Sequence, residues 1–202
     1  MKLIALGAFA LATLAAGSAS AQAPAAPQIS HGPVIAGLCI YSPQRVLVQS
    51  TAGQSLQAGM QRLAEEVRGE LQPYVANIQT EAQQLQTSGS SLPADQLQQR
   101  RQALQQRAQE AQQLESTREN ELRYTLGMQR QAITEAVSPI LTALYQEKGC
   151  GLLLDRESVF MMNPAMDVTD LAIQRLNTAL PTLSFNRLPV PAQTQAQPAA
   201  AN

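Results

Sequence analysis

The chain has 202 residues, a formal net charge of −1, 14% charged residues and 3% aromatic residues, with no Trp. A charge balance this close to neutral gives no electrostatic basis for binding nucleic acid. Large apolar side chains are too few to fill the core of a large compact monomer, so we expect an elongated protein, an oligomer, or both.

The first 21 residues have the pattern of a cleavable signal peptide. Lys2 supplies a positive charge, an apolar run follows, and Ala19-Ser20-Ala21 fits a small-residue cleavage site. The apolar run is shorter than the roughly 20 residues that span a bilayer, which disfavours a membrane anchor. We therefore expect residues 1–21 to be removed on export. Residues 22–33, rich in Ala, Pro and Gln, are typical of a flexible linker.

A short apolar run at residues 34–41 lies between Pro33 and Pro43 and predicts a strand. Apolar side chains occur on both of its faces, so we expect it to be buried on both sides. The residues after Pro43 are interpreted as a short helix or an irregular lead-in to the next element.

The long middle section predicts two antiparallel helices. From Ser55 to Glu147 the sequence is dominated by Gln, Ala, Leu, Glu and Arg, which are good helix formers. Turn residues gather only at residues 88–93. The apolar stripe is weaker after this turn, where several positions are Ala. We therefore expect the outer part of the hairpin, residues 77–115, to be held weakly by packing and to be mobile.

Two further short strands are predicted beyond the hairpin, at residues 152–155 and 159–162, and the two together form a strand hairpin. The sequence Asp-Val-Thr-Asp at 167–170 resembles a capping box and predicts a helix over residues 168–180. From Ser184 onward Pro, Ala and Gln return, and we expect residues 184–202 to be disordered.

Neither the thiols nor the acidic residues indicate a catalytic or metal site. Cys39 and Cys150, the only cysteines, leave two alternatives open, a structural disulfide or two buried free thiols. The spacing of the acids that follow the second strand does not match a calcium loop, and turn and cap roles explain them better. We expect no enzyme, no cofactor and no bound metal.

The order strand, long helical hairpin, strand hairpin and terminal helix resembles the Skp (OmpH) family of periplasmic chaperones. Two stretches carry the resemblance: PVIAGLCIYSPQRVLVQSTAGQSLQAGMQRL, and the more specific SPILTALYQEKGCGLLLDRESVFMMNPAMDVTDLAIQRLN. The resemblance covers residues 34–180 and rests on architecture, with no catalytic signature.

The resemblance implies an α+β fold in which a small three-stranded β body per chain is shared in a homotrimer. Residues 34–54 and 140–183 would form this oligomerisation domain, and residues 55–139 would project as a tentacle. The implied function is that of an ATP-independent holdase in the periplasm of a Gram-negative cell, which binds unfolded outer-membrane β-barrel proteins. One argument is independent of the resemblance: three short strands with two apolar faces are unstable alone. The alternative function is a structural coiled-coil spacer or adaptor of an envelope complex.

Two sets of site residues follow. The predicted trimer interface comprises Val34, Leu38, Ile40, Leu152, Leu154 and Phe160. The predicted client-contact residues of the tentacle are Tyr74, Ile78, Leu85, Leu97, Arg100, Arg101, Leu104 and Arg107. Residues 60–130 hold eight Arg against nine acids, unlike the strongly basic tentacles of well-known family members. We therefore expect at most weak contact with membranes or lipopolysaccharide.

Overall fold

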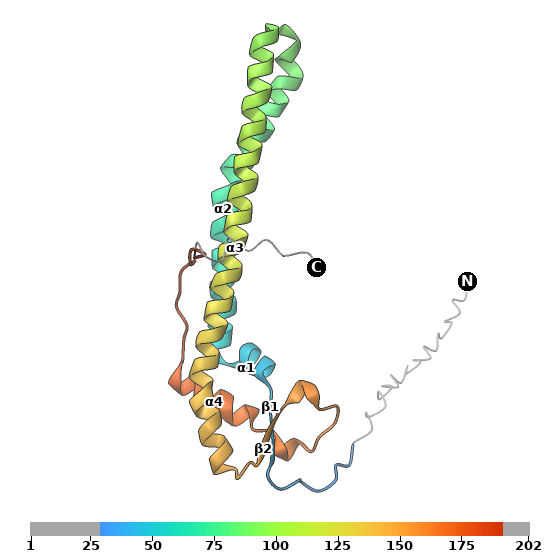
Figure 1. Ribbon diagram of the computed structural model, residues 1–202, viewed down its shortest axis with the longest axis vertical. Helices are drawn as coiled ribbons and strands as arrows, with labels where there is room; N and C mark the ends of the chain where they lie inside the picture. The colour runs from blue at the N-terminus through green and yellow to red at the C-terminus, as the bar shows by residue number, and fades with distance from the viewer. Residues whose placement is uncertain (1–28, 192–202) are drawn as a thin grey trace, which may run out of the picture. The chain divides into compact units, whose positions relative to one another are not determined.

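A computed structural model describes residues 29–191 (Figure 1). The predicted signal peptide, most of the predicted linker and residues 192–202 lie outside this part of the chain. A short N-terminal unit ends at His31, and the account below concerns the unit that begins at Gly32. Its elements are β1 (Leu38–Tyr41), α1 (Pro43–Gln49), α2 (Thr51–Ser88), α3 (Ala94–Glu147), β2 (Leu152–Asp155) and α4 (Thr169–Ala179).

Helices α2 and α3 form the predicted antiparallel hairpin and lie side by side along their length (Figure 1). A 3-10 turn, Gly89–Ser91, joins them, and Pro93 immediately precedes α3. Both helices continue without a break past an internal proline, Pro73 in α2 and Pro139 in α3. The two-helix prediction and the place of its turn are therefore confirmed.

The end of α3 sets the position of the strand that follows. Gly149 has a φ of 63°, a left-handed conformation that glycine adopts without strain. Its N–H donates to the carbonyl of Gln146 at 3.1 Å, and the N–H of Cys150 donates to that of Tyr145 at 2.9 Å. This pair of bonds is a Schellman motif, which satisfies the last carbonyls of the helix. The chain then turns directly into β2.

Strands β1 and β2 pair in parallel, with Leu38 opposite Leu152 and Tyr41 opposite Asp155. Because parallel neighbours need a long crossover, the whole helical hairpin serves as the connection between them. The predicted first strand was too long at its start. Gly37, with a φ of 78°, lies in a turn just before β1 and ends the extended run, so Val34 and Ile35 are exposed instead of buried.

The predicted third strand is wrong, because residues 159–162 form no strand in this chain and the sheet has two strands. A 3-10 turn, Arg156–Ser158, directs the chain away from the sheet after β2. The free edge of β1 is instead used by a single bridge between Ile40 and Asp167, where the N–H of Val168 donates to the carbonyl of Ile40 at 2.9 Å.

The core lies at the base of the hairpin, where α4 packs against α3 and α1. Its fully buried side chains come from every element around the sheet and include Ile40, Val46, Leu144 and Leu176. Helix α4 begins one residue later than predicted and ends one residue earlier. Asp167 still assists its start, since its side chain accepts a hydrogen bond from the N–H of Thr169 at 2.8 Å.

The C-terminal strap, defined here as residues 184–191, differs from the disordered tail predicted for residues 184–202. It has no regular secondary structure, yet it lies against the hairpin (Figure 1). Phe185 packs against the core, and Arg187 forms ion pairs with Glu70 of α2 and Glu121 of α3. The amino-acid composition of the segment could not predict this docking, because the contacts join residues more than 60 positions apart in the sequence.

Candidate functional site

The hairpin changes from a packed base to an unpacked outer half. In α2 the last buried side chain before the tip is Val67, and in α3 the first after the tip is Thr125. Between them, only Gly89 at the tip is buried. Buried apolar contacts are the main source of tertiary stability for a helix, so the outer half of the hairpin depends on helix propensity.

A hollow of about 440 Å³ lies midway along this outer half. It is lined by residues of both helices: Pro73, Tyr74, Asn77, Ile78, Arg107 and Glu110. Three predicted client-contact residues, Tyr74, Ile78 and Arg107, therefore come together there. The Arg107 guanidinium lies 3.6 Å from the carboxylate of Glu81, which is an exposed ion pair of little energetic consequence.

A second hollow, of about 480 Å³, lies at the tip and brings together three more of the predicted residues, Leu85, Leu97 and Arg101. The remaining two do not line either hollow. Leu104 is half-buried on α3, and Arg100 is exposed. Both hollows combine apolar lining residues with one cationic side chain, so each can contact an apolar segment without requiring a fixed hydrogen-bond partner.

An ion network ties the two helices together nearer the base. Arg118 of α3 donates to Glu70 at 2.7 Å and to Glu121 at 3.0 Å. Arg187 of the C-terminal strap pairs with the same two carboxylates, at 2.8 and 3.0 Å. The hydrogen bond from Arg187 lowers the pKa of Glu70, and Arg118 adds to this effect while desolvation opposes it. The sequence analysis did not anticipate this network, since it depends on the docking of the strap.

The predicted trimer-interface residues differ in exposure and fall into three groups. Val34, Leu152 and Phe160 are exposed in the chain, Phe160 by 93% and Leu152 by 52%. Leu38 and Leu154 are half-buried. Ile40 does not belong with them, because it is only 1% exposed and the chain itself already covers it.

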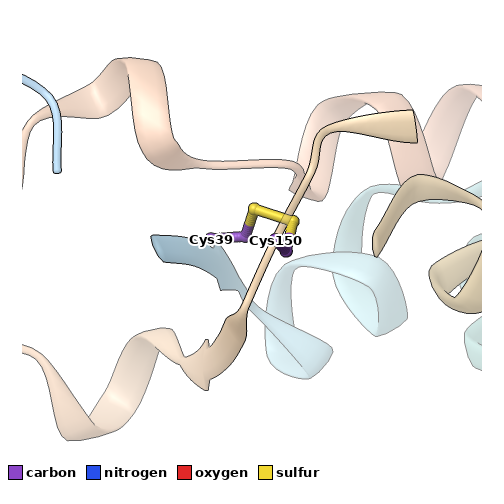
Figure 2. The surroundings of a disulfide bond; sticks show 2 residues. All are labelled: Cys39 and Cys150. Atoms are coloured by element: carbon purple, nitrogen blue, oxygen red, sulfur yellow. A yellow bond between two sulfur atoms is a disulfide. The ribbon is translucent and has the colours of Figure 1, made fainter. Parts of the chain in front are cut away.

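A disulfide joins Cys39 of β1 to Cys150, just before β2 (Figure 2). This settles the open alternative in favour of the bridge. The bond closes a loop that contains α1 and the entire helical hairpin, and both cysteines are buried. The base of the hairpin is thus held covalently where the sheet offers only two short strands.

The acidic residues near the base have structural roles. Asp155 accepts a hydrogen bond from the N–H of Glu157 at 2.9 Å, and Asp167 pairs with Arg45 at 2.9 Å. Asp170 pairs with the same guanidinium. No group of metal-binding side chains occurs among residues 29–191. Within those residues, no helix is long and apolar enough to cross a bilayer.

Comparisons with known proteins agree with this architecture. The family model for OmpH-like outer membrane proteins matches residues 37–176. The chain belongs to the OmpH-like family. A crystal structure from Caulobacter crescentus, described as a candidate outer membrane chaperone of the OmpH-like type, is 30% identical with a TM-score of 0.75. The match covers 82% of this chain and 98% of that one. No curated protein matches.

Membership of the OmpH-like family confirms the resemblance inferred from the sequence and supports a chaperone role. The helical hairpin on a small sheet is consistent with the α+β fold of that family. The whole matched region precedes the C-terminal strap, since the family match ends at residue 176. The strap therefore lies outside the family match, whereas its partners on the hairpin, at residues 59–125, lie within it.

Proposed function

We propose that this OmpH-like chain is an ATP-independent holdase of the periplasm, which binds unfolded outer-membrane β-barrel proteins and prevents their aggregation. Export would follow from the predicted signal peptide, residues 1–21. Binding would take place along the outer half of the hairpin, at the hollows that hold Tyr74, Ile78, Leu85 and Leu97.

One observation carries this proposal: a covalently closed, well-packed base bears a hairpin whose outer half buries no apolar side chain. A holdase must contact many non-native chains weakly, without demanding one complementary shape. Half-exposed apolar groups interspersed with Gln and Ala supply such contact, because no buried polar group is left unsatisfied when the client changes. A fixed adaptor would instead need a fully buried, specific interface core.

The test is suppression of aggregation. The purified mature protein should keep an unfolded outer-membrane β-barrel protein soluble at a ratio of about one assembled chaperone per client. The double variant Tyr74→Ser/Ile78→Ser should weaken binding by about tenfold, given the apolar area lost. Gln72 and Gln79 are exposed in the same turns of α2, so Gln72→Ser/Gln79→Ser is the matched control. Absence of suppression at any excess of chaperone would overturn the proposal.

We further propose that three chains assemble through the β body. The exposed side chains of Val34, Leu152 and Phe160 support this, because exposed apolar groups in or next to the strands of a two-stranded sheet indicate an interface. Light scattering should give a solution mass of three chains, and Phe160→Asp should lower it. A folded single chain in dilute solution would refute the assembly.

A further inference from the structure

The C-terminal strap lies in an extended conformation with alternating burial. Phe185 and Arg187 are half-buried against the hairpin, whereas Ser184 and Asn186 between them are exposed. A period of two residues is that of an extended strand, in which successive side chains point to opposite sides. The hairpin therefore receives every second side chain of an extended peptide over this part of the strap.

The first inward side chain, Phe185, fits a space that exists because residue 59 has no side chain. A Cβ atom added to Gly59 would lie 2.5 Å from the Phe185 ring, well inside contact distance. Glycine within a long helix is unfavourable by about 1 kcal/mol relative to Ala. Gly59 thus gives α2 a recess of the depth that an aromatic ring requires.

The second inward side chain, Arg187, meets a site of negative charge. Its guanidinium lies between Glu70 and Glu121, and among residues 29–191 only Arg118 shares these two carboxylates. When Arg187 is absent, two carboxylates face one guanidinium. The site then carries one excess negative charge and favours a cationic side chain, two residues after the aromatic one.

Two hydrogen bonds recognise the backbone of the strap. Arg62 donates to the carbonyl of Phe185 at 2.7 Å, and the N–H of Leu188 donates to the Thr125 hydroxyl at 2.9 Å. Every peptide has such a carbonyl, and every residue except Pro has such an N–H. The contacts therefore accept an extended segment of almost any sequence at these two positions.

The strap is held loosely enough to be exchanged. Phe185 is half-buried, the Arg187 side chain is still 19% exposed, and Nη1 of Arg187 is buried without a hydrogen-bond partner among the described residues. A buried donor left unpaired weakens the bound state. At the C-terminal end of the strap, a hollow of about 710 Å³ is lined by Pro189, Val190 and residues of α3 from Thr117 to Tyr124, so the path continues toward the tip.

We infer that the recess and ion site filled by the C-terminal strap form a binding groove for extended polypeptide, and that a segment of an unfolded client enters it by displacing the strap. The segment has a large apolar side chain followed two residues later by Lys or Arg. Strands of outer-membrane barrels carry aromatic residues near both membrane interfaces, and such a residue would supply the apolar side chain. This inference deepens the proposed function and rests on it.

The first experiment measures binding of a fluorescent peptide with the sequence of residues 182–191 to full-length chains. In the variant Phe185→Ser/Arg187→Ser the strap is weakened, so the peptide should bind at least tenfold more tightly than to the native chain, whose tethered strap competes at high effective concentration. The control Ser184→Ala/Asn186→Ser changes only outward side chains and should behave as the native chain. Equal binding to all three chains would overturn the inference.

A second pair of variants tests the recess itself, in the chain whose strap is already weakened. Gly59→Ala should abolish peptide binding when added to the weakened-strap chain, because the new methyl group occupies the ring's place. Gly69→Ala in the same helix meets no atom within 4 Å, gains the same helix propensity and should leave peptide binding unchanged. If both substitutions had the same effect, the groove would not be the binding site.

A third measurement uses the native chain and its client. Addition of an unfolded outer-membrane protein should accelerate hydrogen exchange at the Leu188 amide, which the Thr125 hydroxyl protects in the free chain. Unchanged or slower exchange would refute displacement. The proposed function is judged separately, by aggregation suppression. A chain that suppresses aggregation but keeps its strap protected retains the holdase function and loses only this inference.

Discussion

Reduction of the Cys39–Cys150 disulfide should strongly destabilise the base of the hairpin. The two cysteines are 111 residues apart, and the loop between them contains α1, α2 and α3. Cross-linking stabilises a fold mainly by restricting its unfolded state, and the effect grows with the length of the closed loop. The native contacts of the base do not need to change when the bond is cut.

The loop length sets the size of the effect. For 111 residues, the chain-entropy relation gives about 4.8 kcal/mol at 25 °C. With a urea dependence of about 2 kcal/mol per molar, the unfolding midpoint should fall by about 2 M on reduction. Helix content without denaturant should stay the same, because Leu144, Leu176 and the β1–β2 pairing still hold the base.

The assay is urea unfolding followed by circular dichroism, with and without reductant, at one protein concentration, because assembly makes the midpoint depend on concentration. The variant Cys39→Ala/Cys150→Ala is the control, and reductant should not change its midpoint. A difference of less than about 1 kcal/mol between the oxidised and reduced native chains would refute the reasoning. Two free thiols per denatured, unreduced chain would contradict the bridge itself.

The remaining predictions concern packing, mobility and pH. Leu144→Ala, at a fully buried site, should cost about 2–5 kcal/mol of unfolding free energy, whereas Leu85→Ala, half-buried near the tip, should cost less than about 1 kcal/mol; equal urea midpoints would contradict this difference. Amides at residues 77–115 should exchange faster than those at the base, and uniform protection along the hairpin would count against mobile arms. Arg187 lowers the pKa of Glu70 in the folded chain. The Glu70–Arg187 ion pair therefore contributes fully to strap docking above the pKa of an unperturbed Glu, about 4.3, and this contribution is lost as the pH falls through the lowered pKa of the folded chain. The Phe185 ring resonances should therefore shift toward those of a free chain in acid, and this acid-dependent shift should disappear in Glu70→Gln.

The local features of the hairpin could be predicted from the sequence. Helix propensity, the spacing of apolar residues and the turn residues at 88–93 act over a few positions, so they identify both long helices and their junction without knowledge of distant contacts. The decline in packing toward the tip could also be predicted, because Ala replaces Leu along the return stripe. Most of the predicted client-contact residues share hollows for the same reason, since helical spacing places them on facing stripes.

Tertiary structure alone decided the sheet, the disulfide and the strap. A run of four apolar residues such as Val159 to Met162 is compatible with a strand, but whether it forms one depends on a free partner edge, and Asp167 uses that edge of β1. The bridge between Cys39 and Cys150 forms because β1 and β2 pair in parallel, which brings together two cysteines that are 111 residues apart in the sequence. The fit of Phe185 against Gly59 depends on how far the chain rises along α2 after α4. Composition reports average preferences of a segment, whereas each of these outcomes depends on one pairing between residues far apart in the sequence.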